Sequence, residues 1–285
     1  MNDPSKGPGR PGRVKEITAL TNPTIKAIRG LDRKRNREAN NSFMAEGQKL
    51  VIDAVDLGWT IKTLIYAKNA RGHAGVADLA AKVIARGGDV LEVSEKVLGA
   101  ITRRDNPQMV VGVFAMRWAD PKTLPRDADT VCVVLDRVRD PGNLGTILRT
   151  ADAAGAKGII LVGDCVDPFS IEAVRATMGS LFAVPIARMS EEEFLAFRTA
   201  WPGKLIGTHL EGAVDYRTVD WAGSGPLLLM MGNESHGLPD NLAQSCDLLA
   251  RIPQSGRADS LNLAVATGLM LFEARRHALS FKESE

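Results

Sequence analysis

One continuous stretch, residues 131–163, constrains the fold more than any other part of the chain. It begins with the apolar run VCVVLD, passes through a Pro-Gly-Asn turn into a helical segment, and ends in a second apolar run, GIILVG. Uninterrupted apolar runs are typical of parallel strands that are covered on both faces. The stretch therefore predicts a βαβ unit whose loop RDPGN lies at the carboxyl edge of a sheet, where open α/β sheets bind their ligands.

The length and composition of the chain fit a globular protein of two domains. It has 285 residues, of which 45% are hydrophobic and 25% are charged. No apolar run approaches the roughly 18 residues of a membrane span, and the N-terminus lacks the apolar core of a secretory signal. Three widely spaced cysteines, Cys132, Cys165 and Cys246, predict structural thiols in a reduced, cytoplasmic protein.

Positive charge is concentrated at the front of the chain. Residues 1–50 hold eleven Lys and Arg against five Asp and Glu, although the net charge of the whole chain is only +2. This asymmetry indicates either contact with a polyanion or a solvated helix face beside a tail. A low aromatic content of 5% argues against a surface that binds single strands mainly by stacking bases.

A basic helix is predicted after Asn22-Pro23, where the segment TIKAIRGLDRKRNREAN alternates apolar and basic positions at helical spacing. Guanidinium groups offer a fork of donors that pairs well with phosphate oxygens. The helix therefore predicts a phosphate-binding cluster made of Arg29, Arg33, Lys34, Arg35 and Arg37.

The pattern of elements predicts two α/β domains. Residues 1–14 are rich in Pro and Gly and cannot build a core, which predicts a disordered basic tail. Helical and strand segments alternate over residues 15–117, as in a small α/β domain. Residues 118–129 hold two prolines and mixed charge, which predicts a linker. The second domain follows over residues 130–281.

Two later segments place polar loops beside the first one. PLLLMMGNESHGL and LLARIPQSGRADSLNLAVATG each follow an apolar strand with a polar loop, so these loops should converge with RDPGN at one sheet edge. The last helix, starting near Ser260, is apolar nearly all round, which predicts burial on every side. Asn143, Ser260 and Asn262 lie at helix starts, where each fits either a cap or a ligand contact.

Other kinds of site find weaker support. Asp164 follows the loop at about the interval of a ribose-binding acid, but Gly142 and Gly145 do not complete a GxGxxG motif for a dinucleotide. The sequence contains no G-x-S-x-G elbow of a serine hydrolase. Its four scattered histidines, without HExxH or CxxC, argue against a metal site.

Three motifs, NLGTILRTADAAG, LLLMMGNESHGL and IPQSGRADSLNLAVATG, closely resemble those of the SpoU/TrmH family of RNA 2′-O-ribose methyltransferases, in the SPOUT superfamily. They occur in the order and spacing of the family, over about residues 130–280. NPTIKAI and FMAEGQKLVIDAV resemble the α/β substrate-binding domain that precedes many SpoU enzymes, with lower specificity. The chain departs from the family at Gln254, where Met often follows Ile-Pro, and no catalytic role depends on that position.

The resemblance implies a parallel-sheet SPOUT fold with a deep C-terminal trefoil knot that binds S-adenosylmethionine in a bent form. Knots are among the rare exceptions to the rules of chain topology, and composition and periodicity gave no sign of this one. The resemblance also implies a homodimer whose knots face each other, which would cover the apolar last helix. By position, the cofactor contacts are Thr208, Leu210, Gly232, Ile252 and Leu261.

The resemblance further implies the catalytic residues. In this hypothesis Arg149 meets the phosphate of the target nucleotide and helps to activate the ribose hydroxyl. Because the pKa of arginine lies above about 12, we favour a cation that stabilises developing alkoxide charge over a general base. Asn143 would hold the loop and substrate, and Glu234 would orient Arg149 or a neighbour. Ser260 and Asn262 would line the pocket.

The sequence therefore predicts methylation of a ribose 2′-hydroxyl in structured RNA, with the basic residues of the front domain binding that RNA. Ribosomal RNA is favoured because a separate basic domain suits a large folded RNA, and transfer RNA is the alternative. A non-catalytic RNA-binding module made of the same domains is the rival from another class. No metal and no membrane contact are expected.

Overall fold

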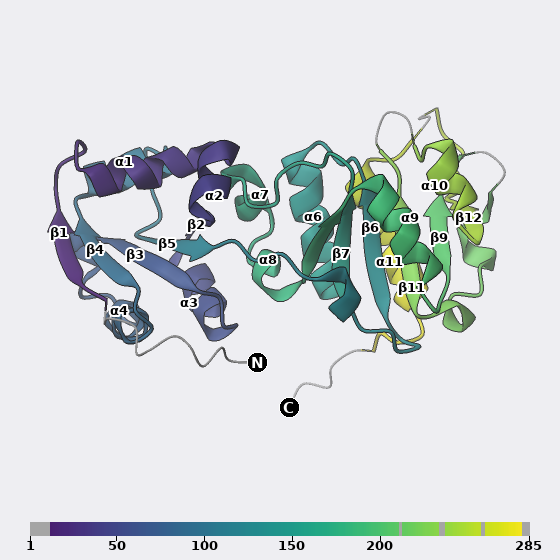
Figure 1. Cartoon of the computed structure of the whole chain (residues 1–285), viewed down its shortest axis with the longest axis horizontal. Coiled ribbons are helices and arrows are strands. Elements are labelled where there is room, and N and C mark those ends of the chain that lie inside the picture. The colour runs from purple at the N-terminus through teal and green to yellow at the C-terminus, as the bar shows by residue number, and fades with distance from the viewer. Residues whose placement is uncertain (1–11, 211–212, 234–236, 258–259, 281–285) are drawn as a thin grey trace. The chain divides into compact units, whose positions relative to one another are not determined.

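The computed structural model describes residues 12–210, 213–233, 237–257 and 260–280. The chain folds into two compact units (Figure 1). The N-terminal unit consists of the residues up to 117 together with 169–175, and the C-terminal unit consists of 118–168 and the residues from 176 on. None of the helices in the described ranges is both long and apolar enough to cross a membrane.

The N-terminal unit is built on a mixed sheet with the strand order β1-β4-β3-β5-β2. Strands β1, β4 and β3 run parallel, whereas β5 runs antiparallel to both of its neighbours. The apolar runs seen in the sequence form these strands, which are β1 (Val14–Ile17), β2 (Ser42–Glu46), β3 (Ile61–Ala67), β4 (Asp89–Val93) and β5 (Val110–Ala115).

Helices cover both faces of this sheet (Figure 1). One face packs against α1 (Pro23–Arg29) and α5 (Glu95–Thr102), in a core that includes Ile25, Ile28, Leu98 and Ile101. The other face contacts α3 (Gln48–Asp56) and α4 (Val76–Ala85). The Ser94 side chain caps α5 by accepting from the N–H of Val97 at 3.3 Å, as its place before an apolar helix suggested.

Regular structure begins inside the segment that the sequence assigned to a disordered tail. Residues 1–11 lie outside the described part, but Arg13 donates its backbone N–H to the Asp89 carboxylate at 3.1 Å. Val14 then begins β1, which pairs with β4. The boundary of the tail at residue 14 is therefore wrong. This short strand of two apolar and two charged residues gains its stability from a partner that is distant in sequence.

The predicted basic helix is two helices joined by a turn. α1 begins after Asn22, whose side chain accepts from the N–H of Thr24 at 2.9 Å. A 3₁₀ turn, η1 (Gly30–Asp32), follows it, and the extended backbone of Arg33 precedes α2 (Lys34–Asn40). The chain therefore turns where the sequence pattern predicted that the helix would continue.

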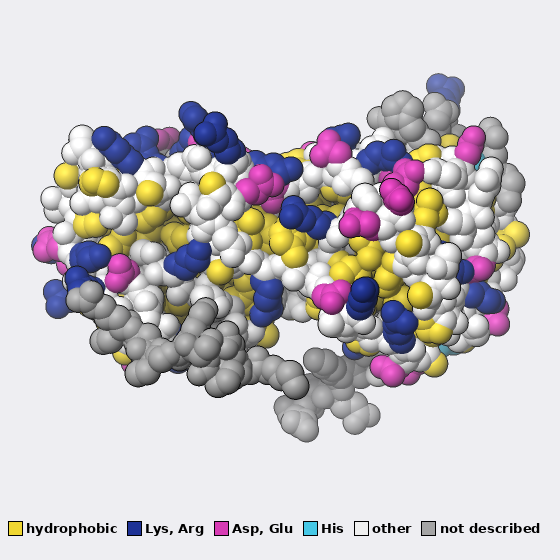
Figure 2. All heavy atoms as spheres, in the orientation of Figure 1, with side chains coloured by type: hydrophobic (Ala, Val, Ile, Leu, Met, Phe, Trp, Pro, Cys, Tyr) yellow, Lys and Arg dark blue, Asp and Glu magenta, His cyan; other side chains and the backbone are white. Residues whose placement is uncertain are grey.

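Arg37 differs from the other four predicted phosphate-binding residues. It is 3% exposed, and its Nη1 donates to the carbonyl oxygens of Leu31 at 2.9 Å and Asp32 at 2.8 Å. These bonds satisfy the carbonyls of η1, so the prediction that Arg37 contacts phosphate is wrong. Figure 2 shows Lys and Arg side chains gathered over α1 and α2, where the remaining members are exposed, namely Arg29, Arg33, Lys34 and Arg35.

Residues 118–129 are packed onto the C-terminal unit and do not form a free linker. Ala119 donates its N–H to the carbonyl of Ile186 at 2.8 Å. After the turn η3 (Pro121–Thr123), Leu124 is 4% exposed and belongs to the core of that unit. The prediction of a linker rested on the proline content, but burial of the apolar Leu124 side chain holds this segment against the C-terminal unit.

A short piece of the C-terminal sequence belongs to the N-terminal unit. Within residues 169–175, the Phe169 ring packs against the Phe43 ring at a centroid distance of 4.9 Å. Arg175 donates to the carbonyl of Thr102 at 2.8 Å and forms an ion pair with the buried carboxylate of Glu46. The predicted domain of residues 130–281 is therefore interrupted, because tertiary packing assigns these residues to the other core.

The C-terminal unit is built on a parallel sheet with the strand order β10-β12-β9-β11-β6-β7-β8. The two central strands, β6 and β11, are buried along their whole length, as their uninterrupted apolar sequences predict. The strands are β6 (Val131–Asp136), β7 (Gly158–Val162), β8 (Ile186–Met189), β9 (Leu205–Thr208), β10 (Val214–Asp215), β11 (Leu227–Met231) and β12 (Leu248–Arg251).

Helices also cover both faces of this sheet. α6 (Pro141–Ala153) and α11 (Leu263–Arg275) pack against each other on one face. α9 (Glu191–Thr199) and α10 (Asp240–Gln244) contribute to the core on the other. The remaining short elements are α7 (Ile171–Ala176), α8 (Ser180–Ala183), η2 (Lys68–Ala70) in the N-terminal unit, η4 (Tyr216–Thr218) and η5 (Ala222–Ser224).

The last helix, α11, is buried on one face only. Met270 and Leu271 are fully buried, whereas Val265, Leu269 and Phe272 are 53%, 42% and 45% exposed. The prediction that this helix is buried on every side is therefore wrong for the single chain. α6 and β11 cover one face of α11, and the exposed residues follow the i, i+4, i+7 spacing of the opposite face.

Candidate functional site

The site lies at the carboxyl edge of the parallel sheet in the C-terminal unit. β12, β9, β11 and β6 are consecutive neighbours there, so the loops that follow them leave from adjacent positions. Three of these loops, together with the start of α11, line a cavity of about 620 Å³. That volume lies within the roughly 300–1,000 Å³ of small-molecule sites.

The five residues predicted to contact a cofactor all line this cavity, and so does Ser260. Thr208 ends β9, and its hydroxyl donates to the carbonyl of Met230 at 3.4 Å, which joins the loop ends of β9 and β11. The carbonyl of Leu210 accepts from the Arg251 guanidinium at 3.0 Å. Gly232 follows β11, Ile252 follows β12, and Leu261 precedes α11.

Gly232 is required by close backbone approach. A Cβ atom at this position would lie 2.4 Å from the carbonyl carbon of Gly237 and 2.6 Å from the amide nitrogen of Leu238. The turn is closed by two backbone hydrogen bonds between Asn233 and Gly237, of 3.0 and 2.9 Å. Gly237 has a φ of +66°, which glycine adopts without strain. Glu234, predicted to orient Arg149, lies outside the described residues.

A strained arginine holds this turn in place. Arg137, the residue after β6, has a φ of +47°, which costs a residue with a side chain roughly 1–3 kcal/mol. Its Nε donates to the Asp136 carboxylate at 2.9 Å and its Nη2 to the Glu191 carboxylate at 2.7 Å. In this conformation its carbonyl accepts from the Asn233 side-chain amide at 2.8 Å. Two ion pairs thus fix the backbone that positions the cavity wall.

Asp136 is nearly fully buried, at 1% exposed. Burial raises the pKa of its carboxyl group, while the neighbouring Arg137 guanidinium acts in the opposite direction. Removing the arginine would therefore leave a buried carboxylate without its main partner, which is costly. The sequence offered a signal for this pair, an Asp-Arg step at the end of a buried strand, but we assigned it no role.

Asn143 and Asn262 meet at the starts of two helices. The Asn262 amide donates to the Asn143 side-chain oxygen at 2.9 Å. The oxygen of Asn262 accepts from the N–H groups of Ala264 and Val265, so Asn262 is the cap of α11, which begins at Leu263. The cap of α6 is Asp140, which accepts from the N–H of Asn143 at 2.6 Å. Asn143 is therefore not the cap, and its side chain contacts the other helix.

Arg149 does not line the cavity of its own chain. It is exposed on α6, and within the described ranges no hydrogen bond or ion pair is formed by its side chain. The guanidinium of Arg149 is therefore positioned by α6 and is accessible to solvent. The structure thus brings Ser260 together with the five predicted cofactor residues and joins Asn143 to Asn262, but these two asparagines and Arg149 are not among the residues that line the cavity.

The three cysteines are free thiols. Burial raises the pKa of the thiol to about 12 for Cys132, to about 11 for Cys165 and to about 12 for Cys246. A thiol with such a pKa stays protonated at neutral pH and is a poor nucleophile. Cys132 is buried and the other two cysteines are half-buried, which fits the structural role that their spacing predicted.

Two family models match this chain. Residues 130–272 match the SpoU rRNA Methylase family, and residues 22–112 match the MRM3-like substrate binding domain. The first match contains every strand of the parallel sheet and the whole cavity. The second covers most of the mixed sheet of the N-terminal unit.

Curated relatives and solved structures agree with these models. The chain is 30% identical, over 92% of its length and 100% of the relative, to the 23S rRNA (guanosine(2553)-2′-O)-methyltransferase RlmP of Bacillus subtilis. It is 34% identical to the 23S rRNA (uridine(2479)-2′-O)-methyltransferase of Streptomyces viridochromogenes, over 89% of its length and 88% of the relative. It also resembles the AdoMet-bound rRNA methyltransferase from Sinorhizobium meliloti, with 61% identity, a TM-score of 0.89, and coverage of 94% of this chain and 99% of that one.

A parallel sheet with a ligand cavity at its carboxyl edge, preceded in the chain by a small α/β domain, agrees with the matches to RNA methyltransferases. The chain belongs to the SpoU rRNA Methylase family. The cavity suits the family's cofactor, because close backbone turns and apolar side chains such as Leu238, Leu261 and Leu263 surround it. Polar and charged residues, among them Thr208, Asn233 and Asp240, also line the cavity.

Replacing Gly232 with Ala tests the wall of this cavity. The added Cβ would overlap the backbone of Gly237 and Leu238, and overpacking of this kind costs about 1–3 kcal/mol. We expect the affinity for S-adenosylmethionine, measured by calorimetry, to fall about tenfold or more. Gly256→Ala is the matched control, since a Cβ there meets nothing within 4 Å. Equal affinities for the two variants would contradict the proposed wall.

Proposed function

We propose that this chain methylates the 2′-hydroxyl of a ribose in ribosomal RNA, with S-adenosylmethionine as the cofactor. The single observation that carries the proposal is the cavity at the sheet edge, which the predicted cofactor residues surround in a chain of the SpoU family. Ribosomal RNA is favoured over transfer RNA because two curated relatives that match most of the chain are named as 23S rRNA methyltransferases, whereas two others carry the broader name tRNA/rRNA methyltransferase. Action in the cytoplasm agrees with the free thiols.

S-adenosylmethionine supplies an electrophilic methyl group when bound. Thr208, Leu210, Gly232, Ile252 and Leu261 hold the cofactor within the cavity that they line. The trefoil knot stays a prediction, and it would bring the loops after β11 and β12 around the same ligand.

Arg149 acts on the RNA. A ribose hydroxyl must lose its proton as it attacks a methyl group, and negative charge develops on its oxygen. A guanidinium stays protonated at neutral pH. Exposed on α6, it pairs with the target phosphate and stabilises that charge. Asn143 and Asn262, bonded to each other, fix the helix starts against which the substrate is placed.

A second copy of the chain completes the site. Arg149 is exposed and lies outside the cofactor cavity of its own chain, while Val265, Leu269 and Phe272 leave one face of α11 apolar and uncovered. Packing of this face against a second copy would remove the apolar surface from water. It would also bring α6 of one protomer, which packs on α11, toward the cavity of its partner.

The basic surface of the N-terminal unit binds the RNA backbone. Arg29, Arg33, Lys34 and Arg35 are exposed on or between α1 and α2. Forked guanidinium donors pair with phosphate oxygens at low geometric cost. This surface contributes affinity and leaves the choice of nucleotide to other contacts.

The activity and the role of Arg149 can be tested together. Wild-type protein, S-adenosylmethionine and RNA from cells that lack the gene should yield a new 2′-O-methyl group in ribosomal RNA, mapped by resistance of the adjacent bond to alkaline cleavage. Arg149→Ala should reduce the rate by roughly 10²-fold or more, because one preorganised charge is lost. Its calorimetric affinity for the cofactor should be unchanged. Methylation confined to transfer RNA would refute the substrate, and a near wild-type rate in Arg149→Ala would refute the role.

The dimer predicts complementation. Sedimentation at micromolar concentration should give about twice the chain mass, and Leu269→Glu with Phe272→Glu should give the monomer and abolish turnover. Mixing Arg149→Ala chains with Gly232→Ala chains should restore up to about a quarter of the activity, because about half of the randomly formed dimers are mixed and each mixed dimer holds one intact site of two. A monomer that still methylates RNA, or no recovery on mixing, would count against the shared site.

The basic surface predicts the salt dependence of RNA binding. Changing Arg33, Lys34 and Arg35 to Gln removes three charges but keeps good helix formers. We expect the log–log slope of affinity against salt to flatten by roughly 0.7–0.9 for each phosphate contact that is lost. The control changes three exposed lysines of the C-terminal unit, Lys122, Lys157 and Lys204, to Gln. If both triple variants show the same slope, the RNA does not bind at α1 and α2.

A further inference from the structure

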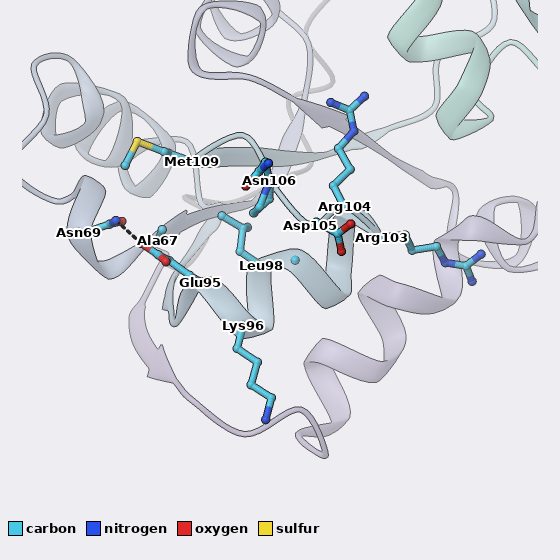
Figure 3. A pocket seen from close by; sticks show the side chains of 12 residues that line it. Ala67, Asn69, Glu95, Lys96, Leu98, Arg103, Arg104, Asp105, Asn106 and Met109 are labelled. Carbon is cyan, nitrogen blue, oxygen red and sulfur yellow. Dashed lines mark hydrogen bonds between the residues drawn. The ribbon is translucent and has the colours of Figure 1, made fainter.

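The N-terminal unit contains a second cavity, of about 670 Å³, that the proposed methyl transfer does not use (Figure 3). It lies where β3 and β4 end, between the end of β3, the first turns of α5 and the loop of residues 103–109. The lining residues that matter below are Ala67, Asn69, Leu98, Arg103, Arg104 and Asn106. Its volume leaves room for one nucleotide and lies in the range of small-molecule sites.

The loop of residues 103–109 is held at both ends. At its start, Arg103 has a left-handed φ of +55°, and the N–H of Arg104 donates to the carbonyl of Gly99 at 3.3 Å. At its end, the N–H of Ala67 donates to the carbonyl of Met109 at 3.0 Å, which ties the loop to β3. The cavity is therefore formed before any ligand binds, which lowers the entropic cost of binding.

The lining combines an apolar floor with amide groups. Leu98 and Ala67 are buried and form the floor. Figure 3 shows Leu98 between Asn69 on one side and Asn106 and Asp105 on the other. The Asn69 amide also bonds to Glu95, which orients it at the rim. An amide offers both donors and an acceptor, as the edge of a nucleobase does, and an aliphatic floor suits the face of a base.

The rim connects this cavity to the basic surface. Arg103 forms an ion pair with Asp32 of η1, the residue next to Arg33. Arg104 lies 3.6 Å from the carboxylate of Glu46, measured from its Nε. Both arginines keep exposed side chains, at 66% and 41%. An RNA backbone that follows α1 and α2 would therefore reach the opening of the cavity along a path lined by cations.

We propose that this cavity binds one unstacked nucleotide of the RNA substrate. Its base lies against Leu98, its edge bonds to Asn69 and Asn106, and its phosphate pairs with Arg103 or Arg104. Because it takes RNA as the substrate, the proposal rests on the proposed function. A free nucleotide has the same chemistry, but the continuity of the rim with Arg33 favours a nucleotide within RNA.

The test compares two amide deletions in the full-length protein. The first variant carries Asn69→Ala and Asn106→Ala, both at exposed positions, and the control carries Gln108→Ala, an exposed amide of the same loop that does not line the cavity. Binding of a 23S rRNA transcript is measured by anisotropy without cofactor, and kcat and KM are measured with it. The double variant should bind the transcript about tenfold more weakly and raise KM equally, as for two lost hydrogen bonds.

The kcat, the affinity for S-adenosylmethionine and the thermal unfolding midpoint should not change in the double variant, which separates the cavity from the methyl-transfer site and from folding. Wild-type RNA affinity in the double variant would overturn the proposal. So would micromolar binding of AMP, GMP, CMP or UMP that the double variant loses while its RNA affinity stays unchanged, since the ligand would then be a free nucleotide. Normal RNA binding without methylation by the wild-type protein would contradict the proposed function instead. The anisotropy measurement would then still show whether the cavity binds RNA.

Discussion

The structure depends on the adjacency of four parallel strands, β12, β9, β11 and β6, which end at one edge of the sheet. Because parallel neighbours end together, the loops after β6 and β11, which begin after Asp136 and Met231, leave from adjacent positions although they are far apart in the chain. The buried ion pair of Asp136 and Arg137 fixes the loop after β6, and the Arg137 carbonyl in turn holds Asn233 in the loop after β11. The cavity is therefore a property of the sheet edge, and no single loop could form it alone.

Charge has two different uses in this protein. In the C-terminal unit, Arg137 uses its charge within the fold, where it is paired with Asp136 and Glu191 at 2.9 and 2.7 Å and stabilises a strained backbone. In the N-terminal unit, most cations of α1 and α2 lie in solvent, where salt screens them and where their affinity for a polyanion is greatest. Arg37 shows that a position in a basic run does not decide which use applies, since its guanidinium bonds to carbonyl oxygens of its own turn.

The division of the chain into units shows how local pattern and tertiary packing can disagree. Pro and Gly content marked residues 1–14 and 118–129 as tail and linker, yet Val14 pairs in a sheet and Leu124 enters a core. Phe169 and Arg175 lie within the sequence of the C-terminal unit but belong to the N-terminal unit. There, Phe169 packs against the Phe43 ring, and Arg175 pairs with the buried carboxylate of Glu46. In each case a partner that is distant in sequence supplies the stabilising contact. Rules based on local composition cannot predict such a contact.

The sequence by itself determined the features that depend on local pattern. Apolar runs located β6, β7 and β11, spacing located the helices between them, and three motifs identified the family and located the residues that line the cavity. Tertiary structure alone decided which side chains meet. It assigned Asn262 to both a helix cap and the Asn143 contact, buried Arg37, left one face of α11 uncovered, and brought Asn69 and Asn106 to one opening. The physical reason is that secondary structure follows from neighbours along the chain, whereas burial and pairing depend on what packing brings from elsewhere.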